Sequence, residues 1–334
     1  MSAVSKNLLL VLGDTLVCLL VFEGMTRLVV DTGMVYELEM WKYARNVKTR
    51  DPNPEIGHRH RPNASAMLMG AAVRTTPHGF RGPAIADTAA PGVARIAFVG
   101  DSITMGWGVR EEEQFSSRVL AALAARGRKV DGFNLGVGNF NTSQELALFR
   151  DAGAKMKPDI IVLAYFINDA EPMPKYGETG WLDENSAAWV VTSYRLDGLA
   201  RQFGDQPGWK DYYRALYDDK APGWQATQRA LVGFATTARE LDAKLIVFNI
   251  PEIRELKPYP FGDITAKVLA LVGKQGVPAV DLLPTVAAMD PPGLWVTVPD
   301  PHPNGRANAA YAQGMLPAIV EMLDSLCRSK GKGC

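Results

Sequence analysis

The feature that most constrains this chain is a short apolar run that ends in a polar turn, in the sequence Ile96-Ala-Phe-Val-Gly-Asp-Ser-Ile-Thr. A continuous apolar run bounded by turn residues is typical of a buried strand in a parallel sheet. Ser102 follows this strand directly, and open α/β sheets bind their ligands at the carboxyl ends of the strands. A Gly-Asp-Ser triplet is common, however, and by itself it also fits an ordinary glycine-rich turn. The rest of the chain decides between the two interpretations.

Further apolar runs follow, and helical patterns separate them. We expect strands at residues 96–99, 130–135, 160–166, 245–250 and 277–281. We expect helices at residues 112–126, 143–155, 224–241, 264–274 and 305–326. Strands that alternate with helices predict βαβ units and a parallel sheet. The predicted fold is therefore a three-layer α/β/α sandwich, with a sheet of about five strands in the flavodoxin-like order.

Composition excludes several classes of function. The 334 residues carry a formal net charge of zero, so nucleic acid is not an expected partner. The four histidines and three cysteines are scattered and form no C-x-x-C or H-E-x-x-H motif, so we expect no metal. The pair His58 and His60 could hold a metal, but an exposed polar loop is the favoured interpretation. Walker and dinucleotide fingerprints are also missing, so we expect no cofactor.

The N-terminal residues 1–30 differ from the rest and predict a membrane anchor. Residues 8–22 are largely apolar. As a helix they span ~22 Å, which is short of the ~30 Å hydrocarbon core of a bilayer. Extension to Val30 gives enough length and includes Glu23 and Arg27, an i,i+4 pair suited to the outer interface. A cleaved signal peptide and an amphipathic helix lying on the protein are the alternatives.

Lys6 precedes the apolar run, which places the N-terminus in the cytoplasm and the remainder outside. The expected location is thus the bacterial inner membrane, crossed once, with the catalytic domain in the periplasm. Cys327 and Cys334 close a short C-terminal loop. In an exported protein they could form a disulfide, whereas in the cytosol they would be two free thiols.

Two further regions follow from composition. Residues 31–92 are interrupted repeatedly by proline and glycine, and we expect them to wrap the catalytic domain without a core of their own. Residues 93–330 form the predicted catalytic domain, with an insertion at about 170–223. The insertion is rich in aromatic residues, namely Tyr176, Trp181, Trp189, Tyr194, Trp209, Tyr212, Tyr213, Tyr217 and Trp224. We expect most of these rings to pack a small core within the insertion and a few to line a substrate groove.

Three polar stretches have the residue types that Ser102 needs for nucleophilic catalysis. They are Asn134-Leu-Gly-Val-Gly-Asn after the second strand, Asn168-Asp after the third, and Asp300-Pro-His-Pro before the last helix. A serine hydroxyl needs a base, and that base needs an orienting acid, so His302 and Asp300 are the candidates. Asp290 is a weaker substitute for Asp300. The backbone N–H groups of Ser102 and of Gly138 or Asn139, with the Asn168 amide, could stabilise an oxyanion.

The four stretches together resemble the conserved blocks of the SGNH, or GDSL-type, hydrolase family. The resemblance covers residues 95–326 apart from the insertion, and it implies Ser102 as nucleophile with Asp101 in a supporting role. It differs from the usual pattern at three points. The oxyanion glycine of the family falls on Asn139, with Gly138 displaced by one position. Phe166 replaces a glycine and should narrow the pocket beside Asn168, and the last block reads Asp-x-His where Asp-x-x-His is common.

The expected anchor, the stretch Pro77-His-Gly-Phe-Arg-Gly and the stretch Asn168-Asp-Ala-Glu-Pro172 together resemble a membrane-anchored bacterial branch of the family that is often associated with envelope or exopolysaccharide modification. The resulting hypothesis is a serine esterase that removes an acyl or acetyl group from an envelope glycan or lipid. The alternative is an O-acyltransferase that uses the same residues and receives its acyl group from a membrane acyltransferase partner. A third hypothesis is a glycan-binding scaffold without catalytic activity.

Overall fold

The strand that precedes Ser102 is buried along its whole length. The computed structural model describes residues 3–174, 180–203, 207–298 and 300–334. Strand β5 (Ala94–Val99) lies between β6 (Val130–Asn134) and β7 (Ile160–Tyr165), and β8 (Lys244–Asn249) and β9 (Ala279–Asp281) complete the sheet. All neighbours are parallel, and the order is β6-β5-β7-β8-β9, which confirms the predicted topology. Each strand lies within two residues of its predicted bounds.

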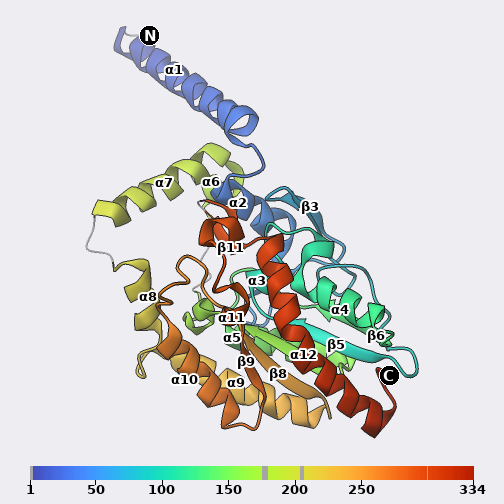
Figure 1. Cartoon of the computed structure of the whole chain (residues 1–334). Coiled ribbons are helices and arrows are strands. Elements are labelled where there is room, and N and C mark those ends of the chain that lie inside the picture. Colours follow the sequence, from blue (N-terminus) through green and yellow to red (C-terminus); the bar gives the residue numbers. More distant parts are fainter. Residues whose placement is uncertain (1–2, 175–179, 204–206, 299) are drawn as a thin grey trace.

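Helices cover both faces of this sheet, as expected for three layers (Figure 1). One face packs against α5 (Thr142–Leu148), α9 (Pro222–Glu240) and α10 (Gly262–Gly273). The other face packs against α4 (Phe115–Ala125), α11 (Leu283–Val286) and α12 (Gly305–Lys330). Along β5, Ala97 and Val99 belong to the first layer, while Ile96 and Phe98 belong to the second. Because both faces are buried, the strand is apolar at successive positions.

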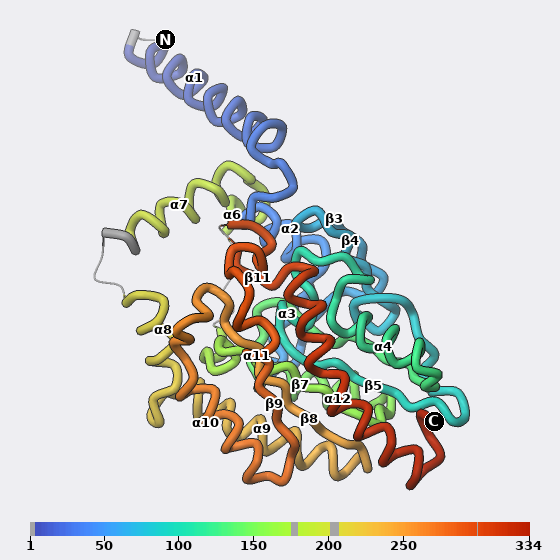
Figure 2. The backbone as a smooth tube through the Cα atoms, viewed as in Figure 1, coloured from blue at the N-terminus to red at the C-terminus, as the bar shows by residue number. Residues whose placement is uncertain are grey.

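The N-terminal helix stands away from this body (Figure 2). Helix α1 (Ala3–Met25) continues into a π-helical turn at Thr26–Val30. The stretch from Val4 to Val30 is long and apolar enough to cross a membrane, and none of its most apolar window is buried in the protein. The alternative of a helix that lies on the protein surface is therefore wrong. A signal sequence has the same length and composition.

The segment between Val30 and β5 contains one helix and two antiparallel hairpins. They are α2 (Tyr36–Asn46), β1 (Lys48–Arg50) with β2 (His58–His60), and β3 (Ser65–Leu68) with β4 (Ala71–Arg74). Tyr43, Leu68 and Val73 from this segment form an apolar cluster together with Met105 and Trp107, which follow Ser102. The cluster is thus shared with the loop that carries the candidate nucleophile.

His58 and His60 do not lie in an exposed loop, so the favoured sequence interpretation is wrong. Both side chains are buried in β2, under rings that include Phe140 and Tyr43. His60 Nε2 is 2.7 Å from the Tyr43 hydroxyl, and His58 Nε2 is 3.0 Å from the Gly138 carbonyl oxygen. Burial lowers the pKa of His58 to about 4 and that of His60 to about 3, so both rings are neutral at physiological pH.

The aromatic-rich insertion consists of helices α6 (Trp181–Asn185), α7 (Ala187–Phe203) and α8 (Trp209–Leu216). The expectation that most of its rings pack a core of their own is wrong. Tyr217 and Trp224 are buried in the main core beside the sheet, and Trp209 and Tyr213 pack against it. Trp181, Trp189 and Tyr194 are exposed. Tyr176 lies outside the described residues.

The C-terminal end of the chain is fastened to the body. Cys327, near the end of α12, and Cys334 form a disulfide, which is one of the two states that the sequence left open. The Gly333 N–H donates to the Gly92 carbonyl, 2.9 Å away, at the start of the sheet domain.

Candidate active site

Ser102 lies on a tight turn at the carboxyl end of the central strand. Asp101 is the N-cap of the short helix α3 (Ser102–Met105), and its Oδ1 accepts a hydrogen bond from the Ile103 N–H at 2.8 Å. A Cβ at position 100 would lie 2.1 Å from Thr104 Oγ1, so only glycine permits this close turn. The chain moves from β5 out to β6 and returns on the other side to β7, so Ser102 lies at the topological switch point of the sheet.

His302 reaches Ser102 from a strand pair that precedes α12. The pair is formed by β10 (Trp295–Thr297) and β11 (Asp300–Pro303), and the Asn304 side chain caps α12 immediately afterwards. His302 Nε2 is 2.9 Å from Ser102 Oγ, and His302 Nδ1 is 2.5 Å from Asp300 Oδ1. This arrangement favours the tautomer in which Nδ1 carries the proton and Nε2 accepts from serine.

Asp300, and not Asp290, is the acid that contacts the histidine. Asp290 is exposed at the start of the turn Pro291–Leu294. The Asp300 carboxylate also accepts the His302 backbone N–H at 3.1 Å and the Trp107 indole N–H at 2.8 Å. Burial raises the pKa of Asp300, but the hydrogen bonds and charge of His302, with the Trp107 bond, outweigh burial and hold that pKa below its usual value.

Three buried carboxyl groups lie behind the serine. Asp101, Glu145 and Asp169 are each at most 1 % exposed. Burial raises the pKa of all three, and the proximity of Asp101 raises those of Glu145 and Asp169 further. Neither carboxyl oxygen of Glu145 has a hydrogen-bond partner among the described residues. A protonated Glu145 is therefore favoured in the folded state.

The structure brings only some of the candidate oxyanion donors to the pocket. Ser102 and Asn168 both line it. The N–H of Gly138 donates to the Tyr43 hydroxyl at 2.8 Å, so this donor is already occupied. Asn139 has a positive φ of 66°, and its side chain accepts from Lys48 Nζ at 2.7 Å. Neither Gly138 nor Asn139 is among the described residues that line the pocket.

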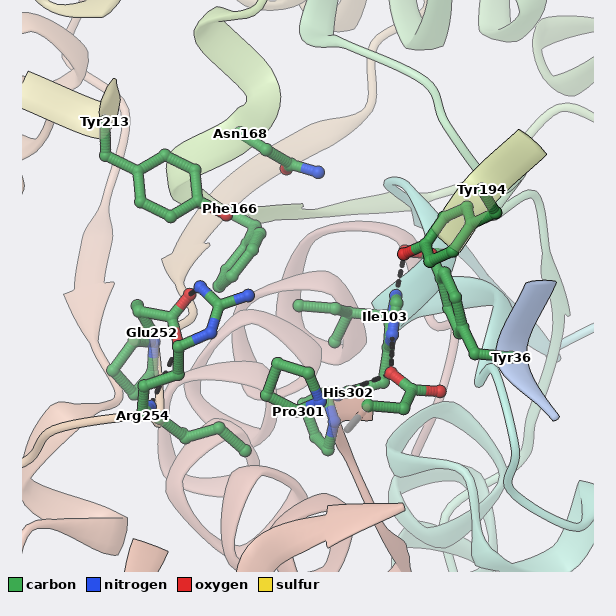
Figure 3. A pocket seen from close by; sticks show the side chains of 15 residues that line it. Tyr36, Ile103, Phe166, Asn168, Tyr194, Tyr213, Glu252, Arg254, Pro301 and His302 are labelled. Carbon is green, nitrogen blue, oxygen red and sulfur yellow. Dashed lines mark hydrogen bonds and ion pairs between the residues drawn. The ribbon is translucent and has the colours of Figure 1, made fainter. Parts of the chain in front are cut away.

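An open pocket lies beside Ser102 and His302. Figure 3 shows Tyr36 and Tyr194 on one side, Tyr213 and Phe166 on another, and Glu252 with Arg254 below them. Phe166 lines the pocket near Asn168, as its position in the sequence predicts. Arg254 Nη1 donates to Glu252 Oε2 at 2.8 Å, and burial raises the pKa of Glu252 despite this cation.

Sequence reasoning missed several residues of the site. The Tyr36 ring stacks on the His302 ring at a centroid distance of 6.3 Å, yet Tyr36 lies in a region that carries no catalytic motif. Burial and the charge of Asp300 raise the pKa of Tyr36. The Glu252–Arg254 pair follows β8 without any recognised pattern. Trp107 could have been recognised from the sequence, because its Gly-Trp-Gly turn directly follows the short helix that begins at Ser102.

The family model of GDSL-like lipases and acylhydrolases matches residues 98–310, which is well over half of the chain. None of the curated proteins compared with the chain matches it. Among solved structures, TesA is 16% identical with a TM-score of 0.46, and the match covers 68% of this chain and 99% of TesA.

LAE5, an α/β hydrolase from the metagenome of Lake Arreo in Spain, is 18% identical with a TM-score of 0.45, over 70% of this chain and 97% of its own. A catalytic mutant of Axe2, an acetylxylan esterase from Geobacillus stearothermophilus, is 16% identical with a TM-score of 0.45, over 68% and 94%. Because the family model matches more than half of the chain, the chain belongs to the GDSL-like lipase/acylhydrolase family.

Proposed function

We propose that the protein is a serine esterase that removes an acyl or acetyl group from an envelope glycan or lipid. Ser102 is the nucleophile, His302 the general base and Asp300 the residue that orients the base. The observation that carries this proposal is the continuous relay of 2.9 Å and 2.5 Å contacts from Ser102 through His302 to Asp300. A relay of this kind makes a serine hydroxyl reactive at neutral pH.

The reaction has two halves. Ser102 Oγ attacks the ester carbonyl while His302 Nε2 takes the hydroxyl proton, and His302 then protonates the leaving alcohol oxygen as the C–O bond breaks. The acyl group remains on Ser102. Water next attacks this acyl-serine, His302 again accepts a proton, and the carboxylic acid leaves as Ser102 recovers its proton. Asp300 stabilises the imidazolium in both halves without taking the proton.

The oxyanion of each tetrahedral intermediate needs donors placed in advance. We assign this role to the Ser102 N–H and the Asn168 side-chain amide, which border the pocket. Gly138 donates its N–H to the Tyr43 hydroxyl, and Asn139 is not among the described residues that line the pocket, so we assign neither as a third donor.

The pocket wall supports an acylated carbohydrate as the substrate class. Tyr36, Tyr194 and Tyr213 present aromatic surfaces, and the Glu252–Arg254 pair supplies both a donor and an acceptor nearby. Apolar and aromatic walls with a few convergent polar groups are typical of small-molecule sites. The faces of a sugar ring fit such walls, while its hydroxyl groups bond to the polar pair.

We propose in addition that residues 4–30 remain attached and anchor the catalytic domain to the outer face of the bacterial inner membrane. Glu23 and Arg27, near the end of this stretch, make hydrogen bonds to residues 185–188 of the body. Removal of a signal peptide would break these contacts. Their presence supports an uncleaved anchor.

Acyl transfer to a carbohydrate hydroxyl is a second candidate function. A hollow that adjoins the pocket is separated from it by Tyr36 and Tyr194 and is also lined by Met40 and Val190. It could hold an acceptor sugar beside the acyl-serine. The chemistry is the same, with the acceptor hydroxyl in place of water.

The test compares the full chain in detergent with its Ser102→Ala variant, using acetyl release from p-nitrophenyl acetate. We expect the variant to lose at least ~10³-fold in kcat, whereas Ser117→Ala, on α4, retains activity. The same reaction with an added oligosaccharide separates the two functions, because an acetylated oligosaccharide indicates transfer. Equal rates for wild type and Ser102→Ala in both formats would refute the enzyme proposal and favour the scaffold.

A further inference from the structure

The insertion helix α7 begins beside the proposed membrane anchor. Figures 1 and 2 show α7 at the end of the body from which α1 projects, running across the direction of α1. More than 150 residues of sequence separate Glu23 from the start of α7, yet the two are hydrogen-bonded. No pattern in the sequence predicts this contact.

The anchor supplies the cap of α7. The Glu23 carboxylate accepts the N–H groups of Ala187 and Ala188, each at 3.0 Å, and the Ser186 hydroxyl at 2.8 Å. Ser186 Oγ in turn accepts the Trp189 N–H at 3.1 Å. The first three N–H groups of the helix are thus satisfied, and a negative charge lies at the positive end of the helix dipole. The start of α7 is therefore fixed at the level of Glu23.

Other contacts make this junction rigid. Arg27 donates to the Asn185 carbonyl at 2.8 Å, and the Trp41 indole donates to the Asp183 carbonyl at 2.8 Å. Leu38 of α2 is fully buried against Ala187 and Val191 of α7. Both the end of the anchor and helix α2 thus hold the insertion in place.

The opposite side of α7 is apolar, and no apolar cluster of the described residues covers it, although the Trp189 indole N–H donates to Asp183 Oδ1 at 2.7 Å. Trp189, Leu196 and Leu199 are 41%, 58% and 49% exposed, and their i, i+7, i+10 spacing places them on one stripe of the helix. In α6, Trp181 is 73% exposed and Leu182 is 45% exposed. We call these five residues the α6–α7 stripe.

We propose that the α6–α7 stripe lies on the lipid surface of the membrane that α1 crosses. This inference rests on the proposed anchor. Glu23 lies near the end of the apolar span, which places it at the interface between hydrocarbon and water. A helix capped at that level, and running across the span, lies along the bilayer surface. Its stripe carries tryptophan and leucine, the residues that interfacial helices insert between lipid headgroups.

This position has a consequence for the active site. Tyr194, on the same helix, lies 6.4 Å from Tyr36 between ring centroids and lines the pocket. The pocket is therefore held at the membrane surface, where an acyl group carried by a lipid-linked donor or glycan would be presented to Ser102. Tyr36 and Tyr194 form the wall that connects the membrane-facing helix to His302.

The test measures how deep three spin labels lie in vesicles of phosphatidylethanolamine and phosphatidylglycerol that contain the full chain. The first label is on the native Cys18, an exposed free cysteine of α1, and reports on the anchor. The second is on Leu196→Cys in a Cys18→Ser background. The third is the control Val232→Cys in the same background, since Val232 is an exposed aliphatic residue of α9, at the far end of the body.

We expect labels at 18 and 196 to collide more often with dissolved oxygen than with a water-soluble nickel complex, and the label at 232 to show the reverse. If the label at 196 is accessible to the nickel complex like the label at 232, while the label at 18 lies in lipid, the membrane position of the α6–α7 stripe is refuted and the anchor is supported. If the label at 18 is also accessible to water, both the anchor and the position of the stripe are refuted. Protection of 196 in native membranes but not in pure lipid would assign the stripe to a protein partner. Ser102-dependent hydrolysis in the same vesicles reports on the esterase proposal separately.

Discussion

At the scale of single residues, the site depends on how firmly Asp300 is held. One carboxylate accepts hydrogen bonds from the His302 ring, the His302 backbone and the Trp107 indole. Two of these donors belong to His302, which lies two residues after Asp300 on the same strand. The short Asp-x-His spacing therefore brings the two side chains together within β11. Trp107 supplies the one bond that comes from the nucleophile loop.

Trp107→Phe tests this bond. The change removes the donor to Asp300 Oδ2 while it keeps most of the ring volume. Since a hydrogen bond to a charged group contributes about 1.5–3 kcal/mol, we expect kcat/KM to fall by at least tenfold. Trp295→Phe is the matched control, because that indole donates to the Ile253 carbonyl. Unchanged kcat/KM in Trp107→Phe would show that the orientation of Asp300 does not depend on the indole.

The buried Glu145 predicts how stability changes with pH. Its pKa is raised in the folded state, so folding favours the protonated form. Its contribution to stability is full below the unfolded carboxyl pKa of ~4.3, and is lost as pH rises through the raised pKa of the folded state. Glu145→Gln should therefore unfold at higher urea than wild type in neutral and alkaline buffer, with a gain that grows with pH. If the urea midpoints of Glu145→Gln and wild type run parallel over the pH range, this prediction is wrong. The control is Glu240→Gln, at an exposed position, whose midpoints should run parallel to those of wild type.

The residues of the relay could be predicted because each lies in a short polar stretch after an apolar run. Tyr36, Tyr43 and the Glu252–Arg254 pair could not, since their roles depend on contacts between segments far apart in sequence. The same reason explains the wrong expectation for His58 and His60. Polar residues in a short strand suggest exposure, but Phe140 and Tyr43 cover them from other segments.

At the scale of structural elements, one buried arginine connects the N-terminal hairpins to the nucleophile loop. Arg81 Nη1 donates to the carbonyls of Met105 and Gly106, and Nη2 donates to that of Val109 at 2.6 Å. Burial lowers the pKa of this guanidinium to about 10. Arg81 belongs to the stretch Pro77-His-Gly-Phe-Arg-Gly, whose resemblance to a family motif did not indicate a structural role.

Arg81→Met removes these donors and leaves the Met105 and Val109 carbonyls without their donor, while the Gly106 carbonyl still accepts the Val109 N–H at 3.1 Å. At about 1–3 kcal/mol for each buried unsatisfied group, we expect a loss of at least ~2 kcal/mol in unfolding free energy. Trp107 would also lose its fixed position, so activity should fall before unfolding is complete. The control is Arg74→Met, because Arg74 is exposed and forms only a 3.9 Å pair with Glu111. A denaturant midpoint equal to that of wild type would contradict the assigned role of Arg81.

The sheet and its longer flanking helices were predictable because the central strands β5, β7 and β8 are largely continuous apolar runs that alternate with amphipathic helical patterns. The structure of residues 31–92 was less predictable from the sequence. Its strands are three or four residues long. The apolar residues of its helix and hairpins share one buried cluster with Met105 and Trp107, which belong to another segment. A pattern within one segment does not reveal a core that two segments share.

At the scale of the whole molecule, a series of contacts connects the proposed anchor to the proposed nucleophile. Within residues 4–30, Arg27 bonds to the end of α6 and Glu23 to the start of α7, and Tyr194 of α7 lines the pocket. The relay itself joins Ser102 to residues two hundred positions later, through the return of the chain to the switch point of the sheet. Composition predicted the anchor, but only the fold shows its end in contact with the insertion.

The central claim is that an acyl group is carried on Ser102. The most direct measurement is mass spectrometry of the full chain, quenched in acid during turnover of p-nitrophenyl acetate and digested to locate the modification. We expect one acetyl group on the peptide that contains Ser102. The level of this acetylation should be much lower in His302→Ala, and the acetyl group should be absent in Ser102→Ala. Two results would contradict this mechanism. One is acetyl release by the wild type without acetylation of Ser102, and the other is the same level of acetylation on a different residue in Ser102→Ala.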